Sequence, residues 1–202
     1  MYMNRWFLIA IAALGIYYFI NRPGEVKNVG NSNVTIVAFG DSLTAGYGVS
    51  EENSYPSVLS DLIGRGVVNL GKSGETAAEA PLRISEVLNY TPYMVLIEFG
   101  ANDAMRAMST TDAIRAVGQI VDSVQRAGAV AVIIDTGAPG MGAYTKAYKR
   151  MAKEKGAVFV PGIMTDIINK PELKSDSVHP NKQGYKLVAE KVYKEIKPYL
   201  KK

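Results

Sequence analysis

Short, uninterrupted runs of apolar residues alternate with segments of helical periodicity from residue 34 to the C-terminus. The apolar runs cover residues 34–39, 67–70, 94–99, 129–134 and 158–160, and the helical patterns cover residues 56–63, 76–88, 110–127, 143–155 and 182–196. Strands that are apolar throughout are typical of parallel sheets covered on both faces. We therefore predict an α/β fold, in which a five-stranded parallel sheet forms the middle of a three-layer α/β/α sandwich.

The length of the chain supports a single globular body. Its 202 residues are enough for one domain with a full hydrophobic core, but too few for two such domains. In a parallel sheet of this kind, ligands bind outside the carboxyl ends of the strands. The loops in which we expect chemistry therefore follow Phe39, Leu70, Phe99, Ile134 and Val160.

Charge and cysteine content narrow the function classes. The net charge is +4, and seven lysines lie after residue 181. We interpret these lysines as the solvated face of a terminal helix, with attraction to an anionic membrane or an acidic substrate as the alternative. No motif of base-reading or stacking residues is evident, so we expect no nucleic-acid partner. The absence of Cys excludes disulfides, thiolate metal sites and a cysteine nucleophile.

The N-terminal residues 6–20 are apolar and uncharged, with Arg5 before them and Arg22 after them. A helix of this length is roughly 22 Å long, which is short for a hydrocarbon core of about 30 Å. No small-x-small cleavage pattern follows the run. We favour an uncleaved signal anchor, followed by a cleaved signal peptide and, third, a buried helix.

These features divide the chain into three parts. Residues 1–22 form the signal anchor or signal peptide, residues 23–33 a linker, and residues 34–202 the globular domain. An anchor predicts a membrane-held domain outside the cytoplasm, either periplasmic or extracellular. Cleavage of the N-terminal segment predicts a secreted protein instead.

The loop after the first predicted strand reads GDSLTAGYG, at residues 40–48. A serine here lies at the carboxyl edge of the sheet, where its hydroxyl can face a crevice and nearby backbone N–H groups can bind an oxyanion. Ser42 is therefore a candidate nucleophile, with a turn or helix cap as the alternative. Asp41 is expected to have a structural role, accepting hydrogen bonds from nearby backbone N–H groups.

A nucleophilic serine needs a base, and His179 is the only histidine of the chain. Asp176 lies three residues earlier, a spacing that lets its carboxylate reach the imidazole Nδ1 and fix its orientation. Asn102, after the third predicted strand, is a candidate oxyanion donor, with an Asx turn or helix cap as the alternative. A single histidine argues against a zinc or di-metal hydrolase, and we expect no metal and no cofactor.

Four blocks of the sequence resemble the SGNH (GDSL) hydrolase family, and the resemblance covers residues 34–200. The blocks are GDSLTAGYG at 40–48, NLGKSGET at 69–76, GAND at 100–103 and DSVHP at 176–180. The resemblance is closest to the thioesterase I / lysophospholipase L1 / arylesterase branch, in which Glu98 also matches. Glu75 departs from that branch, where Asp is usual.

The resemblance implies a flavodoxin-like SGNH hydrolase fold and the activity of a serine esterase. It assigns Ser42, Asp176 and His179 as catalytic residues, and it assigns the oxyanion hole to Ser42, Gly74 and Asn102. The implied reaction is hydrolysis of carboxylic esters or thioesters, of lysophospholipase, arylesterase or acyl-thioesterase type, through a covalent acyl-enzyme. The expected partner is a small-molecule ester, thioester or lipid.

Two other functions are open at this point. The same groups would serve an O-acetylesterase acting on cell-envelope polysaccharide or peptidoglycan, and a non-catalytic, membrane-anchored binding domain would keep the fold. An apolar groove favours lipid or aryl esters, whereas a shallow polar cleft favours the deacetylase. Four methionines in or near the carboxyl-edge loops either line an acyl site or simply pack: Met105, Met108, Met141 and Met164.

Overall fold

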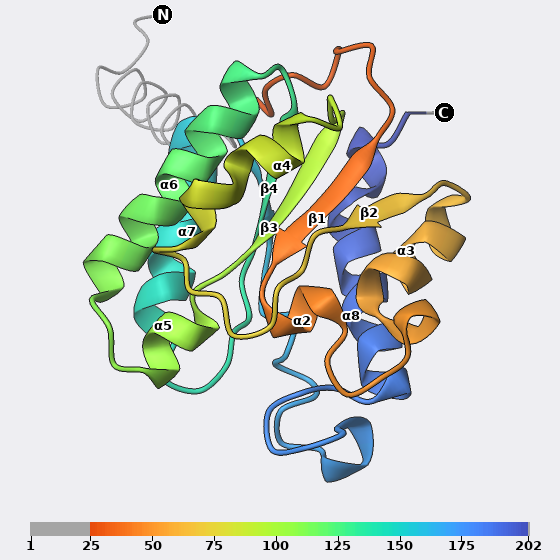
Figure 1. The fold of residues 1–202 in the computed structure, drawn as a ribbon, viewed down its shortest axis with the longest axis vertical. Coiled ribbons are helices and arrows are strands. Elements are labelled where there is room, and N and C mark those ends of the chain that lie inside the picture. The colour runs from red at the N-terminus through yellow and green to blue at the C-terminus, as the bar shows by residue number, and fades with distance from the viewer. Residues whose placement is uncertain (1–24, 202) are drawn as a thin grey trace, which may run out of the picture.

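A computed structural model describes residues 25–201 and contains a sheet of five parallel strands (Figure 1). The strands are β1 (Ile36–Gly40), β2 (Val67–Asn69), β3 (Met94–Glu98), β4 (Val130–Ile134) and β5 (Val158–Val160). Every residue of β1, β3 and β4 is buried, which explains their uninterrupted apolar sequences. The order β2-β1-β3-β4-β5 is that of flavodoxin-like sheets, and the predicted fold class is confirmed.

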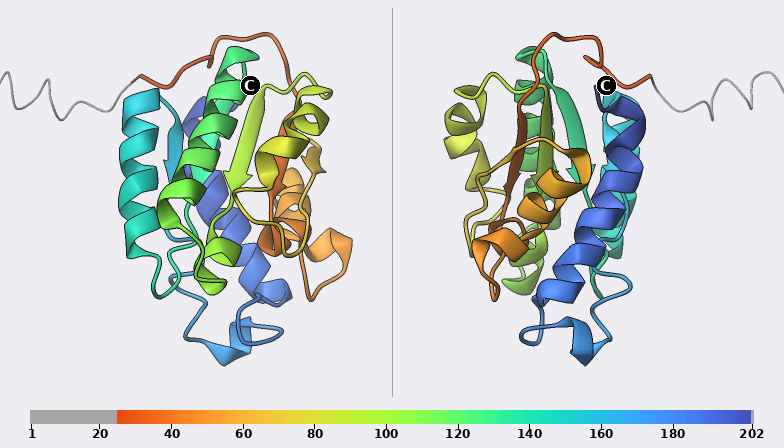
Figure 2. Two further views of the ribbon diagram at one scale, coloured as in Figure 1. Left: turned by 60° about the vertical axis from the view of Figure 1, so that its left-hand side comes forward. Right: turned by 90° about the vertical axis from the view of Figure 1, so that its right-hand side faces the viewer.

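Helices cover both faces of the sheet (Figures 1 and 2). They are α2 (Ser42–Ala45), α3 (Tyr55–Ile63), α4 (Ile84–Leu88), α5 (Ala101–Met105), α6 (Thr110–Arg126), α7 (Gly142–Lys155) and α8 (Lys182–Ile196). Helices α4, α6 and α7 pack on the face that presents Val37 and Ile97. Helices α3 and α8 pack on the face that presents Ile36 and Leu96. Alternate residues of each strand therefore serve two separate apolar cores.

The helix predicted over residues 76–88 is shorter than expected. Residues Ala80–Arg83 form a 3-10 turn, and the α-helix α4 begins only after it. Pro81 has no N–H to donate to a preceding turn. The Glu79 carboxylate instead accepts hydrogen bonds from the backbone N–H and the hydroxyl of Thr76, at 2.9 and 2.8 Å. These bonds close a turn before the helix starts.

The connections at the carboxyl edge of the sheet diverge between β1 and β3. Strand β2 lies on one side of β1 and β3 lies on the other, so the chain leaves these strands in opposite directions and a crevice opens there. Ser42 follows β1, and Asn102 lies just after β3. The loop of residues 161–181 brings His179 to the same edge, and the His179 carbonyl accepts a 2.9 Å hydrogen bond from the Ser175 N–H.

Residues 25–33, predicted as a linker, lie along the opposite, amino edge of the sheet (Figure 2). The Asn28 side chain donates to the carbonyls of Gln125 and Ala129, both at 2.9 Å. From the other end of the chain, the Lys201 ammonium donates to two carbonyls of the same segment. Residues 25–33 and His179 therefore lie at opposite ends of the sheet.

The predicted signal anchor at residues 1–22 lies outside the described residues. Between residues 25 and 201, none of the helices combines the length and the apolar character that crossing a membrane requires.

Candidate active site

Ser42 is the first residue of α2 and directly follows the buried strand β1. Asp41 caps this short helix, because its Oδ1 accepts a 2.9 Å hydrogen bond from the Leu43 N–H. The strand end and the cap together fix the backbone on both sides of Ser42. The expected structural role of Asp41 is thus visible as a helix cap.

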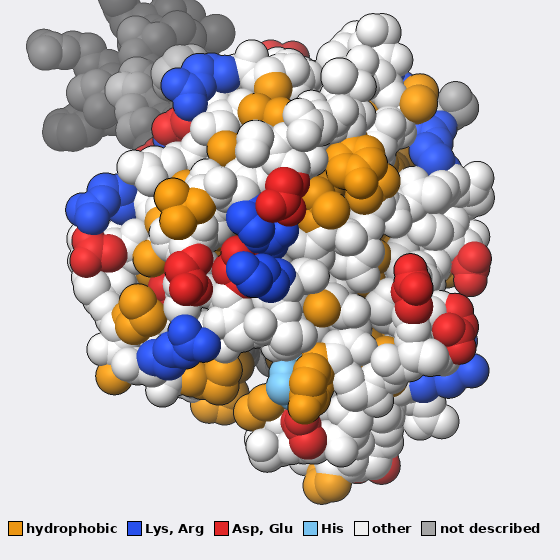
Figure 3. Space-filling model, in the orientation of Figure 1, with side chains coloured by type: hydrophobic (Ala, Val, Ile, Leu, Met, Phe, Trp, Pro, Cys, Tyr) orange, Lys and Arg blue, Asp and Glu red, His pale blue; other side chains and the backbone are white. Residues whose placement is uncertain are grey.

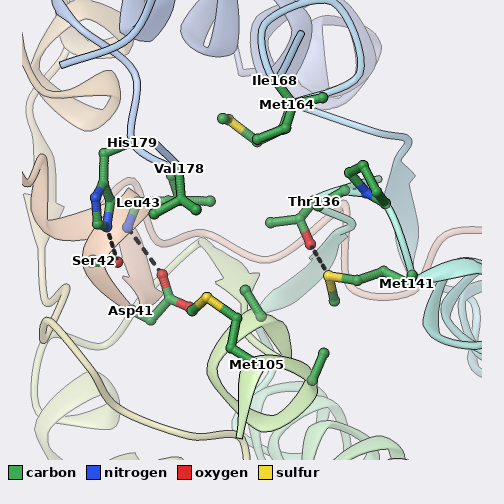
Figure 4. A pocket seen from close by; sticks show the side chains of 15 residues that line it. Asp41, Ser42, Leu43, Met105, Thr136, Met141, Met164, Ile168, Val178 and His179 are labelled. Carbon is green, nitrogen blue, oxygen red and sulfur yellow. Dashed lines mark hydrogen bonds between the residues drawn. The ribbon is translucent and has the colours of Figure 1, made fainter. Parts of the chain in front are cut away.

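The only histidine lies within hydrogen-bond distance of this serine. His179 Nε2 is 2.9 Å from Ser42 Oγ (Figure 4). On the other side of the ring, His179 Nδ1 is 2.7 Å from Asp176 Oδ2. The structure therefore brings together the three side chains that the sequence predicted as a catalytic set. In Figure 3 the imidazole lies at the surface, beside hydrophobic side chains.

The Asp176 carboxylate is held in its charged form. Its other oxygen, Oδ1, accepts the backbone N–H groups of Val178 and His179, both at 2.8 Å. Desolvation is the largest single influence and opposes ionisation, but these two N–H groups and the His179 ring together outweigh it and lower the pKa of Asp176 to about 2. A charged carboxylate on Nδ1 directs the imidazole Nε2 toward the serine.

The Asn102 amide joins the loops that carry the other two predicted oxyanion donors. Its Nδ2 donates to Asp41 Oδ2 at 3.1 Å and to the Glu75 carbonyl at 2.9 Å. Asp41 is the neighbour of Ser42, and Glu75 is the neighbour of Gly74. The three predicted oxyanion donors, Ser42, Gly74 and Asn102, therefore come from segments that are in direct contact.

A pair of carboxyl groups, Asp41 and Glu98, lies behind Ser42. The β1–β3 register sets Gly40 opposite Glu98, which places the Glu98 side chain beside Asp41. Both carboxyls are buried. Burial raises the pKa of Asp41 to about 6, and burial together with Asp41 raises the pKa of Glu98 well above its usual value. Glu98 Oε2 accepts from the Thr44 hydroxyl at 3.1 Å, whereas Oε1 has no hydrogen-bond partner among the described residues, so a neutral acid fits this site.

A cavity of about 410 Å³ opens beside Ser42 and His179. Its walls are mostly apolar and include Leu43, Met105, Met141, Met164, Ile168 and Val178, whose side chains face a common space in Figure 4. The Thr136 hydroxyl is directed to the Met141 sulfur at 3.0 Å and so presents little polarity to the cavity. Three of the four methionines singled out from the sequence line this cavity, and Met108 does not.

Three contacts near the site were not anticipated from the sequence. The Tyr47 ring packs on the His179 ring, with centroids 4.5 Å apart. The Arg106 guanidinium donates to the Gly74 carbonyl at 2.8 Å. Glu98 matched the family branch, but its pairing with Asp41 depends on strand register. Of the residues in these contacts, only Tyr47 had a local sequence signal, because the glycines on each side of it in the first block indicate a tight turn.

Within residues 25–201, no group of three or more His, Asp or Glu side chains is placed to hold a metal ion. The polar groups around Ser42 instead form the hydrogen-bonded arrangement of a serine, a base and its carboxylate, which is suited to nucleophilic attack on an acyl carbon.

Two characterised proteins are similar to this chain over most of its length. Thioesterase 1/protease 1/lysophospholipase L1 of Escherichia coli (strain K12) is 29% identical over 174 residues, which cover 81% of this chain and 84% of that protein. An arylesterase of Vibrio mimicus is 29% identical over 206 residues, which cover 96% of this chain and 100% of that protein.

The fold is similar to that of a solved esterase. The psychrotrophic esterase EstA from Pseudoalteromonas sp., in a structure inhibited by monoethylphosphonate, superposes with a TM-score of 0.75 at 29% identity, covering 83% of this chain and 98% of that one. The sequence model of the GDSL-like Lipase/Acylhydrolase family matches residues 38–187, well over half of the chain. Sequence, fold and site geometry agree, and the chain belongs to the GDSL-like lipase/acylhydrolase family of serine ester hydrolases.

Proposed function

We propose that this hydrolase cleaves carboxylic esters or thioesters of an apolar acyl chain, as a lysophospholipase, arylesterase or acyl-thioesterase does. The observation that carries the proposal is the cavity of about 410 Å³ beside Ser42 and His179. Its apolar walls remove an acyl chain from water, whereas an acetyl group leaves most of the cavity unfilled.

In the proposed acylation step, His179 Nε2 takes the proton of Ser42 Oγ as this oxygen attacks the carbonyl carbon. The 2.9 Å contact between the two atoms is within reach for that transfer. The bond to the leaving alcohol or thiol then breaks, and His179 returns the proton to the leaving atom. The acyl group remains as an ester on Ser42, and Asp176 stabilises the imidazolium during the transfer.

Deacylation repeats these proton transfers with water. His179 takes a proton from water as the water oxygen attacks the acyl carbon, and the Ser42 oxygen leaves with that proton. The acid is released, and the free enzyme is restored.

The carbonyl oxygen becomes negative in both steps. We assign its stabilisation to the backbone N–H groups of Ser42 and Gly74 and to the Asn102 amide. In the free site, the bonds of Asn102 to Asp41 and to the Glu75 carbonyl fix the plane of this amide before a substrate arrives. The longer of the two, the 3.1 Å bond to Asp41, is the one that we expect the oxyanion to share.

The acyl preference is tested with p-nitrophenyl esters and acyl thioesters of increasing chain length, beside an acetylated glycan. Each CH₂ group buried in the cavity is worth about 0.8 kcal/mol, or about fourfold in kcat/KM, until the cavity is full. We expect kcat/KM to rise from acetyl through medium chains. A maximum at acetyl, with faster release of acetate from the glycan, would support the O-acetylesterase instead.

A variant that narrows the cavity sharpens the same test. Ala104 lines the cavity from α5, and Ala104→Leu is expected to lower activity on medium chains while acetyl ester hydrolysis is kept. Ala143→Leu is the matched control, because Ala143 is exposed on α7 and does not line the cavity. Equal chain-length profiles for all three proteins would remove the cavity from the acyl site.

The proposal extends to location, with the domain anchored to a membrane through residues 1–22 and exposed outside the cytoplasm. The uncharged run at residues 6–20, without a cleavage pattern after it, supports an anchor. In cells that express the full chain, we expect the protein in the membrane fraction, with its domain open to external protease. Ile11→Arg should reduce the membrane-bound fraction, and a processed protein in the medium would indicate a cleaved signal peptide.

A further inference from the structure

The side chain of Tyr47 covers one side of the His179 imidazole. The ring centroids are 4.5 Å apart and the ring planes are tilted by 39°. About half of the Tyr47 side chain is exposed (52%), and Tyr47 is not part of the acyl cavity wall. The tyrosine therefore contacts the imidazole without occupying the space that we assign to the acyl chain.

The glycines on both sides of Tyr47 have backbone conformations that favour glycine. Gly46 and Gly48 both have left-handed conformations, with φ of +81° and +85°. A Cβ on Gly48 would lie 2.3 Å from the Ser175 hydroxyl oxygen, so the two loops approach each other closely here. The buried Tyr185 of α8 donates its hydroxyl to the Tyr47 carbonyl at 3.0 Å. The loop after the nucleophile is thus clamped against the loop that carries the base.

The imidazole must carry a positive charge whenever it has taken a proton from Ser42 or from water. The charged groups near it are Asp176, on Nδ1, and Asp41, buried behind Ser42. An aromatic ring within about 6 Å of a cation attracts it through the negative ring face. The Tyr47 ring meets this distance.

We propose that Tyr47 is a positioning residue for the ester hydrolysis, whose ring holds the His179 imidazole between Ser42 and Asp176 and stabilises its protonated form. The inference rests on the proposed role of His179 as the base. No hydrogen bond links the Tyr47 hydroxyl to the described residues, so the ring and not the hydroxyl carries the effect. Tyr47 thereby acts through His179 and does not itself touch the reacting atoms.

The test compares Tyr47→Leu with Tyr47→Phe, and Tyr90→Leu is the control for loss of an exposed tyrosine elsewhere. We expect Tyr47→Leu to lower kcat by about 2- to 30-fold, the rate equivalent of a cation–π contact, with little change in KM. Tyr47→Phe and Tyr90→Leu should stay within about twofold of the wild type. In Tyr47→Leu, the acid limb of the kcat/KM profile should move to lower pH.

The chain has a single histidine, so one imidazole signal in the NMR spectrum reports on His179 without assignment. The Tyr47 ring current should displace this signal in the wild type and in Tyr47→Phe, and the displacement should be lost in Tyr47→Leu. This measurement uses the free enzyme, so it stands even if His179 proves not to be the base. Loss of activity in Ser42→Ala and His179→Ala tests that base assignment separately.

Three results would overturn the inference. Tyr47→Leu with unchanged kcat and pH profile would show that the ring does not act on the base. A change confined to KM would place Tyr47 against the substrate. A lower kcat with an unmoved acid limb, in a protein that unfolds at a lower temperature, would reduce Tyr47 to a packing residue.

Discussion

Carboxyl groups on two sides of Ser42 have pKa values that are shifted in opposite directions. Asp176 lies on a partly exposed loop, where two backbone N–H groups and the imidazole lower its pKa to about 2. Asp41 and Glu98 are buried behind the strand ends, where desolvation raises the pKa of both groups. Hydrogen-bond donors and access to water therefore set the direction in which the pKa of each carboxyl group in this site is shifted.

The two regions also differ in what their charge does. A fixed negative charge on Asp176 supports the imidazolium in the proposed mechanism. The pair behind Ser42 lies beside Asn102, and a second full negative charge there would oppose an oxyanion. A Glu98 that keeps its proton limits the pair to one charge.

The largest effect is expected at Asp176. Asp176→Asn keeps the shape of the side chain but removes the charge that orients the imidazole, so turnover should fall on the order of 10⁴-fold. Asp166→Asn is the matched control. Asp166 also forms an ion pair, with Lys191 at 2.8 Å, but this pair is not part of the catalytic set. Steady-state hydrolysis of a p-nitrophenyl ester measures both. Asp176→Asn within tenfold of the wild type would contradict the assigned role.

The next effect contrasts two buried glutamates. Glu75 is ion-paired with Arg83, with Glu75 Oε1 2.7 Å from Nε, whereas Glu98 has no cationic partner among the described residues. Glu75→Gln removes the buried one of the two carboxylates that pair with Arg83 and leaves only the half-exposed Glu86, which should lower the free energy of unfolding by about 1–3 kcal/mol. Glu98→Gln replaces a neutral acid with a neutral amide, so its unfolding free energy should be unchanged or higher at pH 7. Urea unfolding measures the free energy of unfolding of both variants. An equal loss of unfolding free energy in both would mean that Glu98 is charged.

The smallest effect is a difference in pH dependence. A raised pKa in the folded state makes Asp41 stabilising below about pH 3.8, and this contribution is lost as the pH rises through about 6. Asp41→Asn keeps an oxygen for the cap bond from the Leu43 N–H but sets an NH₂ group against the Asn102 amide at every pH, so its melting temperature should improve relative to the wild type from pH 4 to pH 7. The pH dependence of the Asp176 contribution has the opposite sign. This contribution to stability is present above about pH 3.8 and is lost as the pH falls toward 2.

The melting temperatures of the wild type, Asp41→Asn and Asp176→Asn between pH 2 and pH 7 test these two pH dependences. The destabilisation caused by Asp176→Asn should shrink as the pH falls below 4. Parallel curves for the two variants would mean that the two carboxyl groups do not differ.

Much of the fold followed from the sequence because buried parallel strands leave an uninterrupted apolar signature, as in residues 94–98 and 130–134. The prediction of one α-helix over residues 76–88 was wrong for its first part, because the turn at Thr76 and the proline at position 81 compete with helical periodicity. Ser42, Asp176 and His179 could be grouped because one histidine leaves one choice of base.

Other parts of the site depend on contacts between distant segments. The Asp41–Glu98 pair follows from the register of β1 against β3, and no local sequence pattern predicts that register. The Tyr47–His179 contact joins residues from two loops far apart in sequence, and it exists only when the fold brings them together. Residue identity suggested the chemistry, and packing determined which groups are charged.

The central claim is that Ser42 is the nucleophile activated by His179, and covalent labelling with a fluorophosphonate tests it most directly. The serine oxygen displaces fluoride at phosphorus, so the wild type should carry one label, mapped to Ser42 by peptide mass analysis. Ser177→Ala, on the exposed part of the His179 loop, should label like the wild type, while His179→Ala should label far more slowly. A label on Ser42→Ala, or ester hydrolysis by that variant at the wild-type rate, would contradict the account.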